Sequence, residues 1–126
     1  MTKLVEGELS YRVIGALFKV YNTLGGGYQE KYYQKAVANE FKKQNIKFKE
    51  QVHVPLVYEK ESIGRYFIDF VVEDKIVLEL KATQIFFPRD IKQIYAYLKT
   101  SGIPLGILAG FSKDSLKIKR ILRGYK

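Results

Sequence analysis

Apolar positions in the first third of the chain follow the period of an α-helix. They recur three or four residues apart from about Glu8 to Leu24, and the glycines at 25–27 must end that helix. A second helix is predicted to open just after the glycines and to run to about Gln44. Residues 48–58 then predict a strand, in which Pro55 indicates a sheet edge or a bulge.

Strand and helix patterns follow one another in the rest of the chain. Residues 66–72 and 76–82 alternate at the strand period on either side of the polar turn Glu73–Lys75, which predicts a β-hairpin. A helix is expected from about Arg89 to Thr100, because Pro88 and Asp90 suit its first turn. The short apolar run from Pro104 to Phe111 predicts a buried strand.

The tail SLKIKRILRGYK alternates apolar and basic residues, so we expect an edge strand there rather than a short helix. The order of helix, helix, three strands, helix, strand and tail predicts an α/β fold, with a three-layer α/β/α core around a mixed sheet of four or five strands. No linker, internal repeat or low-complexity tract interrupts this order, and residues 1–126 are therefore expected to form a single domain.

Charged residues stand inside the two apolar strands of the predicted hairpin. Glu79 and Lys81 project together from the second strand. If the turn is centred on Asp74, Asp69 of the first strand lies directly opposite Glu79, and their Cβ atoms are only ~5 Å apart. The strand period places Tyr66, Ile68, Phe70 and Val72 on one face of the first strand and Phe67, Asp69 and Val71 on the other.

Two carboxylates at that separation repel each other unless a cation or a shared proton lies between them. Oxygen ligands on rigid strands suit a hard divalent ion such as Mg²⁺ or Mn²⁺, and Lys81 would lie where a phosphate oxygen or an attacking water is expected. The alternative is a plain ion pair between Glu79 and Lys81 on a half-exposed sheet.

Composition favours a phosphate-bearing partner. The 126 residues include 22 Lys and Arg against 13 Asp and Glu, a formal net charge of +9, which favours nucleic acid although many basic surfaces are only solvated. The absence of cysteine excludes disulfides and thiolate metal sites. The N-terminus lacks the apolar core of a signal peptide and no run reaches transmembrane length, so we expect a cytoplasmic protein without a membrane partner.

Four motifs follow one another along the chain. Gly27, Glu30 and Tyr33 match a GxxExxY signature, Asp69 follows, Glu79 to Lys81 forms an ExK element, and Gln93 to Tyr97 forms a QxxxY element. In this order and spacing the chain resembles the bacterial GxxExxY protein family, which belongs to the PD-(D/E)xK nuclease superfamily. The resemblance covers nearly the whole chain and implies a restriction-endonuclease-like fold.

The resemblance also implies roles for the matching residues. Asp69, Glu79 and the main-chain carbonyl of Leu80 would bind the metal, and Lys81 would orient the attacking water or neutralise charge on the phosphate. Glu30 would approach from the second helix and touch a metal through water or anchor the site. The alternative for Glu30 is a first-turn acid that complements the helix dipole.

Gln93 and Tyr97 are four residues apart and therefore share one helix face. The resemblance implies that the amide holds a group of the active site and that the phenol donates to a phosphate. The alternative is a core tyrosine beside a solvated glutamine. The basic tail residues are further candidates for contacts with a nucleic-acid backbone: Lys117, Lys119, Arg120 and Arg123.

The sequence therefore predicts a Mg²⁺- or Mn²⁺-dependent nuclease that hydrolyses phosphodiester bonds, with DNA as the favoured substrate. One alternative is a non-catalytic module of the same fold that binds nucleic acid or docks a partner, and whose binding weakens with salt. Another is a homodimeric, structure-selective junction endonuclease, because archaeal Holliday junction resolvases share this size and order of active-site residues.

Overall fold

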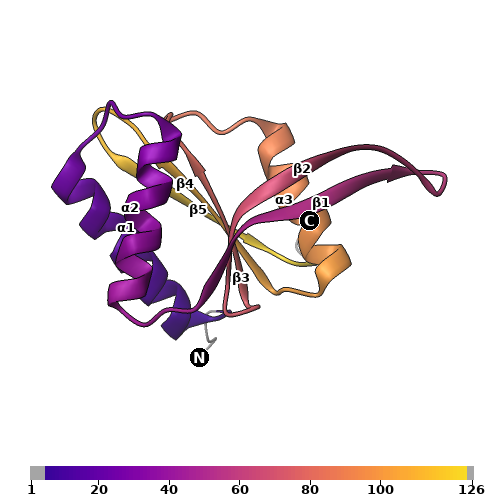
Figure 1. Ribbon diagram of the computed structural model, residues 1–126, viewed down its shortest axis with the longest axis horizontal. Coiled ribbons are helices and arrows are strands. Elements are labelled where there is room, and N and C mark those ends of the chain that lie inside the picture. The colour runs from indigo at the N-terminus through magenta and orange to yellow at the C-terminus, as the bar shows by residue number, and fades with distance from the viewer. Residues whose placement is uncertain (1–4, 125–126) are drawn as a thin grey trace.

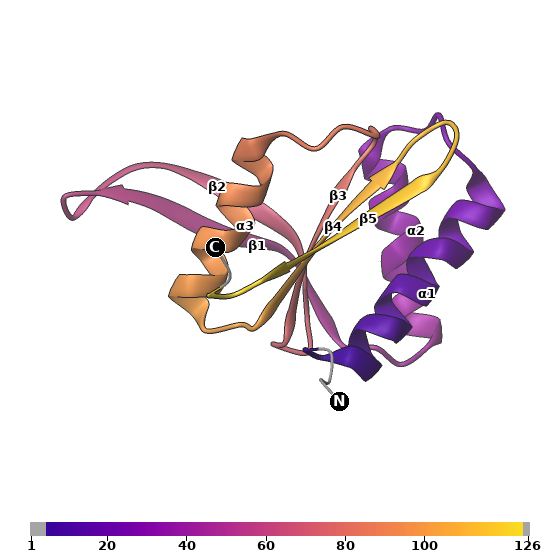
Figure 2. The same ribbon diagram turned by 180° about the vertical axis from the view of Figure 1, so that it is seen from behind.

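A mixed sheet lies between two layers of helices in the computed structural model, which describes residues 5–124. Helices α1 and α2 cover one face of the sheet and α3 covers the other (Figure 1; Figure 2). This arrangement confirms the predicted three-layer α/β fold. The elements are α1 (Gly7–Leu24), α2 (Glu30–Lys43), β1 (Phe48–Tyr58), β2 (Glu61–Val72), β3 (Ile76–Lys81), α3 (Pro88–Ser101), β4 (Leu105–Phe111) and β5 (Leu116–Leu122).

The five strands lie in the sheet in the order in which they occur in the chain. All neighbouring pairs are antiparallel except β3 and β4, which are parallel and are joined through α3. The tail forms edge strand β5, as the alternating pattern predicts. Pro55 lies in the other edge strand, β1, next to a register shift at Leu56 and Val57, so both expectations for this proline are confirmed.

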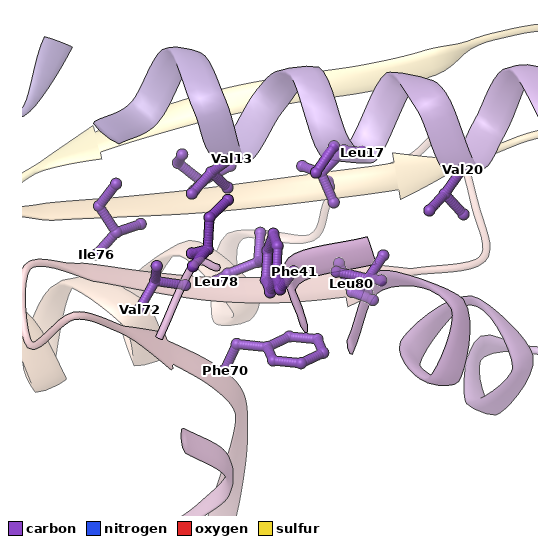
Figure 3. Packing of buried hydrophobic residues seen from close by; sticks show 14 of the residues in the cluster. Val13, Leu17, Val20, Phe41, Phe70, Val72, Ile76, Leu78 and Leu80 are labelled. Atoms are coloured by element: carbon purple, nitrogen blue, oxygen red, sulfur yellow. The ribbon is translucent and has the colours of Figure 1, made fainter. Parts of the chain in front are cut away.

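The larger hydrophobic cluster fills the space between the sheet and the helices α1 and α2 (Figure 3). The ring of Phe41 on α2 is fully buried and meets Phe70 of β2 edge to face, with 5.5 Å between ring centroids. Helix α1 contributes Val13, Leu17 and Val20 at helical spacing, which explains why its period predicted an amphipathic helix.

A second cluster joins α3 to the opposite face of the sheet. Ile94 and Leu98, four residues apart on α3, are buried against Val77 of β3 and Leu108 of β4. Because β3 is buried on both faces, four of its six residues are apolar and its first three form a continuous apolar run, as in strands covered on both sides.

The predicted faces of β2 require one correction. Phe70 and Val72 belong to the cluster under α1 and α2, whereas Tyr66 and Ile68 pack with the cluster under α3. The strict period of two was therefore wrong across Asp69. The physical reason is a local break in the β1–β2 ladder. Glu50 pairs with Phe70 and Val52 with Ile68, whereas Gln51, which has a φ of 49°, and Asp69 between them do not pair.

Within residues 5–124, no helix combines the length and the apolar character needed to cross a membrane.

Gly106 of β4 allows the close approach of α3, because a Cβ at that position would overlap the Ile94 side chain. We expect Gly106→Ala to push α3 away from the sheet and to lower the free energy of unfolding by about 1–3 kcal/mol. The matched control is Gly15→Ala on the exposed side of α1, where a Cβ meets nothing within 4 Å. That change should stabilise the protein by about 0.5–1 kcal/mol, and urea unfolding of both variants tests the difference in sign.

Candidate active site

The pairing of β2 with β3 stops just before the two predicted metal-binding acids. Its register is the one expected for a hairpin centred on Asp74. Continued by one step, the ladder would place Asp69 opposite Glu79, but no main-chain pair forms there. The ladder consists of three pairs, Val72 with Ile76, Val71 with Val77, and Phe70 with Leu78.

Side chains replace the main-chain hydrogen bonds at this point. The N–H of Asp69 donates to Oε1 of Glu79 at 3.0 Å, and the N–H of Leu80 donates to Oδ2 of Asp69 at 2.8 Å. Gln51 of β1 donates from Nε2 to the other carboxylate oxygen of Asp69 at 3.4 Å. Each acid is therefore held by the main chain of the strand opposite its own.

Burial makes it unfavourable for both acids to carry their charge. Asp69 is only 8% exposed, and burial raises its pKa above the ordinary range. Burial first, and the neighbouring charge of Asp69 second, raise the pKa of Glu79 to about 8. Near neutral pH, this pair therefore needs a shared proton or a cation.

Lys81 supplies the nearest positive charge. It partly opposes the upward pKa shifts of Asp69 and Glu79, although it does not form the predicted alternative ion pair with Glu79. Its Nζ instead lies 3.7 Å from Oδ1 of Asp90 on α3. The other oxygen of Asp90 accepts a hydrogen bond from the N–H of Phe87 at 3.2 Å, so Asp90 joins the start of α3 to the site.

Glu30 is the first residue of α2 and reaches the same group of charges. Partial burial of its carboxyl group raises its pKa most; Asp69 and Asp90 raise it further, and Lys81 lowers it. Glu30 is therefore close enough to the acids of the hairpin to interact with them electrostatically, and its role in the site stays a prediction. The structure therefore gives Glu30 surroundings that a helix-dipole role alone does not explain.

The tyrosine of the GxxExxY signature positions the loop before Glu30. Tyr33 is fully buried and stacks on Phe111 with 4.3 Å between ring centroids. Its hydroxyl donates to the carbonyl of Gly25 at 2.7 Å and accepts from the N–H of Tyr28 at 3.3 Å. Gly27 has a φ of 97°, a backbone conformation that favours glycine.

A small cavity beside Glu79 and Lys81 brings α3 and β2 into the site. Gln93 lines it together with Tyr66 and Asp90. The hydroxyl of Tyr66 donates to the main-chain oxygen of Gln93 at 3.2 Å. Burial, followed by the charge of Glu79, raises the pKa of Tyr66, so this phenol stays protonated as a hydrogen-bond donor.

Tyr97 lies one helical turn beyond Gln93 on α3. It is half-buried and packs at the edge of the cluster that contains Ile94 and Leu98. Its phenol is close enough to contribute to the raised pKa of Tyr66, but Tyr97 is not among the residues that line the cavity. Of the QxxxY pair, the structure thus brings Gln93 to the cavity beside Glu79, whereas Tyr97 does not line this cavity.

The donor set fits a hard divalent cation, but it is small. Asp69 and Glu79 offer carboxylate oxygens, and burial has removed the water that would otherwise stabilise their charge. Among the residues that the structure describes, no group of three or more His, Cys, Asp or Glu side chains could hold a metal ion. Further ligands would have to come from the main chain, from water or from substrate phosphate.

Comparison with known protein families shows to which family the chain belongs. The profile of the "PD-(D/E)XK nuclease superfamily" matches residues 7–121. The chain belongs to this superfamily. It is therefore a nuclease-superfamily domain, and PD-(D/E)XK nucleases generally use divalent metals.

Two solved structures resemble the PD-(D/E)XK domain described above. The crystal structure of SSO0001 is 16% identical with a TM-score of 0.56, and the match covers 76% of this chain and 50% of that one. The alkaline exonuclease LHK-Exo from Laribacter hongkongensis is 15% identical with a TM-score of 0.49, covering 98% and 72%. The PD-(D/E)XK chain thus spans half the length of SSO0001, and that likeness supports the fold alone. No curated protein matches the sequence.

Three residues beside the PD-(D/E)XK acids were not predicted as parts of the site. Asp90 carried a sequence signal only for the start of a helix, and Tyr66 and Gln51 looked like ordinary strand residues. Their contacts arise from the packing of α3 and from the irregular pairing of β1 with β2. Neither the packing of α3 nor the irregular strand pairing can be predicted from the hydrophobic pattern of the sequence.

The raised pKa of Glu79 predicts how stability depends on pH. The folded protein retains a proton on Glu79 that the unfolded chain loses near pH 4.3, so the stability of metal-free protein should fall as pH rises from about 5 to about 8. Glu79→Gln mimics the protonated form and should flatten this decline by on the order of 2 kcal/mol. Thermal unfolding in EDTA tests this, and parallel pH profiles for the two proteins would contradict it.

Proposed function

We propose that this chain is a metal-dependent nuclease of the GxxExxY family that hydrolyses phosphodiester bonds in DNA. The observation that carries this proposal is the buried pair of Asp69 and Glu79, held on opposing strands with Lys81 beside it. Two carboxylates whose charge is so poorly solvated are stabilised by a divalent cation. The single-domain organisation of residues 1–126 and the cytoplasmic location stay predictions from the sequence.

Asp69, Glu79 and the main-chain oxygen of Leu80 would hold Mg²⁺ or Mn²⁺. When bound, such an ion acts as a Lewis acid toward phosphate and water. Glu30 would take part through a bridging water, since the described residues provide no group of three acids around one ion. The N–H of Leu80 remains bonded to Asp69, and this bond fixes the carboxylate while it binds.

Lys81 would act on the phosphate itself. Hydrolysis forms a bond between phosphorus and a water oxygen, breaks the bond to the leaving sugar oxygen, and increases negative charge on the phosphate. The Lys81 ammonium would stabilise that charge or orient the water, and its partner Asp90 would keep it pointed toward the acids. Gln93 would position a group at the cavity, and Tyr97 would donate to a phosphate or support Tyr66.

The net charge of +9 supports a nucleic-acid substrate. Two of the basic tail residues, however, are less available for contacts with a nucleic-acid backbone than the sequence predicted. Arg120 donates to Ser10 and to the carbonyl of Val5, each at 2.8 Å, and Arg123 donates to the carbonyl of Gly102. These arginines stabilise the fold. Lys119 on β5 is exposed and remains a candidate for backbone contacts.

Cleavage of end-labelled single-stranded, duplex and four-way-junction DNA, and of RNA, tests the proposal. We expect cutting with Mg²⁺ or Mn²⁺, none in EDTA, and a loss of roughly 1,000-fold or more in Asp69→Asn and Glu79→Gln. The matched control is Asp74→Asn in the exposed turn of the same hairpin, which should cut normally.

Equal cutting by Asp69→Asn and the native protein would show that the acids are not the site. A native protein that cuts nothing, but binds nucleic acid in a salt-sensitive and metal-independent way, would be a binding module. Thermal stability adds a readout besides activity: Mn²⁺ should raise the melting temperature of the native protein but not that of Asp69→Asn.

Asp90 is predicted to position Lys81. Asp90→Asn keeps an oxygen that can accept from Phe87 but removes the charge that attracts Lys81. We expect kcat to fall about 10- to 100-fold with little loss of stability. In a Lys81→Gln background the same change should have no further effect, and additive losses in the double variant would exclude this role.

A further inference from the structure

Strands β1 and β2 continue beyond the body of the protein as a two-stranded arm (Figure 1; Figure 2). At the base of the arm, Val54 and its partner Tyr66 still pack against the cluster under α3. The pairing continues outward to Tyr58 and Glu61. We call residues 55–65 the arm tip.

The arm tip exposes apolar side chains without a helix to cover them. An isolated two-stranded hairpin is only marginally stable in water, and exposed apolar groups gathered on one segment mark an interaction surface. The exposed fractions are 41% for Leu56, 61% for Val57, 62% for Tyr58 and 68% for Ile63.

Charge indicates the kind of partner. The arm tip carries Glu59 and Glu61 against Lys60 and Arg65, so its net charge is zero in a chain whose net charge is +9. A surface that binds nucleic acid needs an excess of positive charge, which the arm tip lacks. A second copy, in contrast, can approach this neutral segment without the repulsion expected between the cationic parts of two chains.

The distribution of charge is also self-complementary. In a two-fold symmetric interface the same patch occurs on both subunits, so residue i of one contacts residue j of the other. Acids and bases that alternate along one short segment can pair in this way. Pro55 and the register shift beside it discourage pairing through the strand edge, which leaves the side chains as the contacting surface.

We propose that this protein forms a homodimer in which the arm tips of two copies pack against each other through their apolar side chains. The same strand, β2, carries the arm tip and Asp69, and about 26 Å of extended chain separates Glu61, near the end of the arm, from Asp69. The dimer therefore couples two candidate active sites through a continuous ribbon. If the proposed nuclease function holds, it also delivers two cuts to one substrate.

Sedimentation equilibrium of the full chain tests the proposal. We expect a mass of two chains at about 100 µM protein, and a dissociation constant at least tenfold weaker for Tyr58→Ser combined with Ile63→Ser. The matched control is Tyr11→Ser, which changes an 81%-exposed tyrosine on α1 and should leave the dimer intact. Circular dichroism verifies that each variant is folded.

Charge reversal provides a test that a mere loss of folding cannot imitate. Glu59→Lys with Glu61→Lys makes one arm tip strongly positive, and Lys60→Glu with Arg65→Glu makes another strongly negative. Each protein alone should be monomeric, and an equimolar mixture should form heterodimers.

The proposal is wrong if the native protein stays monomeric. It is also wrong if Tyr58→Ser combined with Ile63→Ser leaves the dissociation constant of the dimer unchanged. Loss of DNA binding in the arm-tip variants of a monomeric native protein would assign the arm to nucleic acid instead. The measurement is repeated with Asp69→Asn, which should dimerise normally, so that a failure of the nuclease proposal stays distinguishable from a failure of this one.

Discussion

The exchange of hydrogen bonds between Asp69 and β3 is the interaction on which the rest of the site depends. Each acid accepts an N–H from the opposing strand, at the point where the regular ladder between β2 and β3 ends. The two carboxyl groups therefore satisfy main-chain groups that would otherwise be buried without partners. The same bonds hold two poorly solvated acids side by side, so the hydrogen bonding of the hairpin and the unfavourable charge of the pair share one structural origin.

The change of face at Asp69 explains how one hairpin serves two helical layers. On the C-terminal side of Asp69, Phe70 packs under α1 and α2. On its N-terminal side, Ile68 packs under α3. The crossover leaves the acid between the two hydrophobic clusters, where α2 brings Glu30 from one side and α3 brings Asp90 and Gln93 from the other. A site at this junction can draw polar groups from every layer without interrupting either core.

Much of this fold follows from local pattern, because period, turn length and breakers lie within short windows. The hairpin register was predictable, since a single turn at Asp74 and a two-sided apolar pattern leave one consistent pairing. The change of face was not, because it depends on the unpaired Gln51, which lies in another strand, β1. The role of Asp90 could not be predicted for a related reason, because its contact with Lys81 exists only when α3 is packed against the sheet. For the site, the sequence thus predicted the acids and Lys81, and tertiary packing determined what surrounds them.

The sheet order has a consequence for how the protein folds. Every strand lies beside its neighbour in the chain, so most pairings close short loops, and only the parallel step from β3 to β4 requires a crossover. Pairings that close short loops lose less conformational entropy than pairings between distant segments. Asp69 and Glu79, ten residues apart, meet as soon as their hairpin forms, whereas Asp90 joins them only after the crossover helix has docked. We therefore expect the two acids to come together early in folding, before their surroundings are complete.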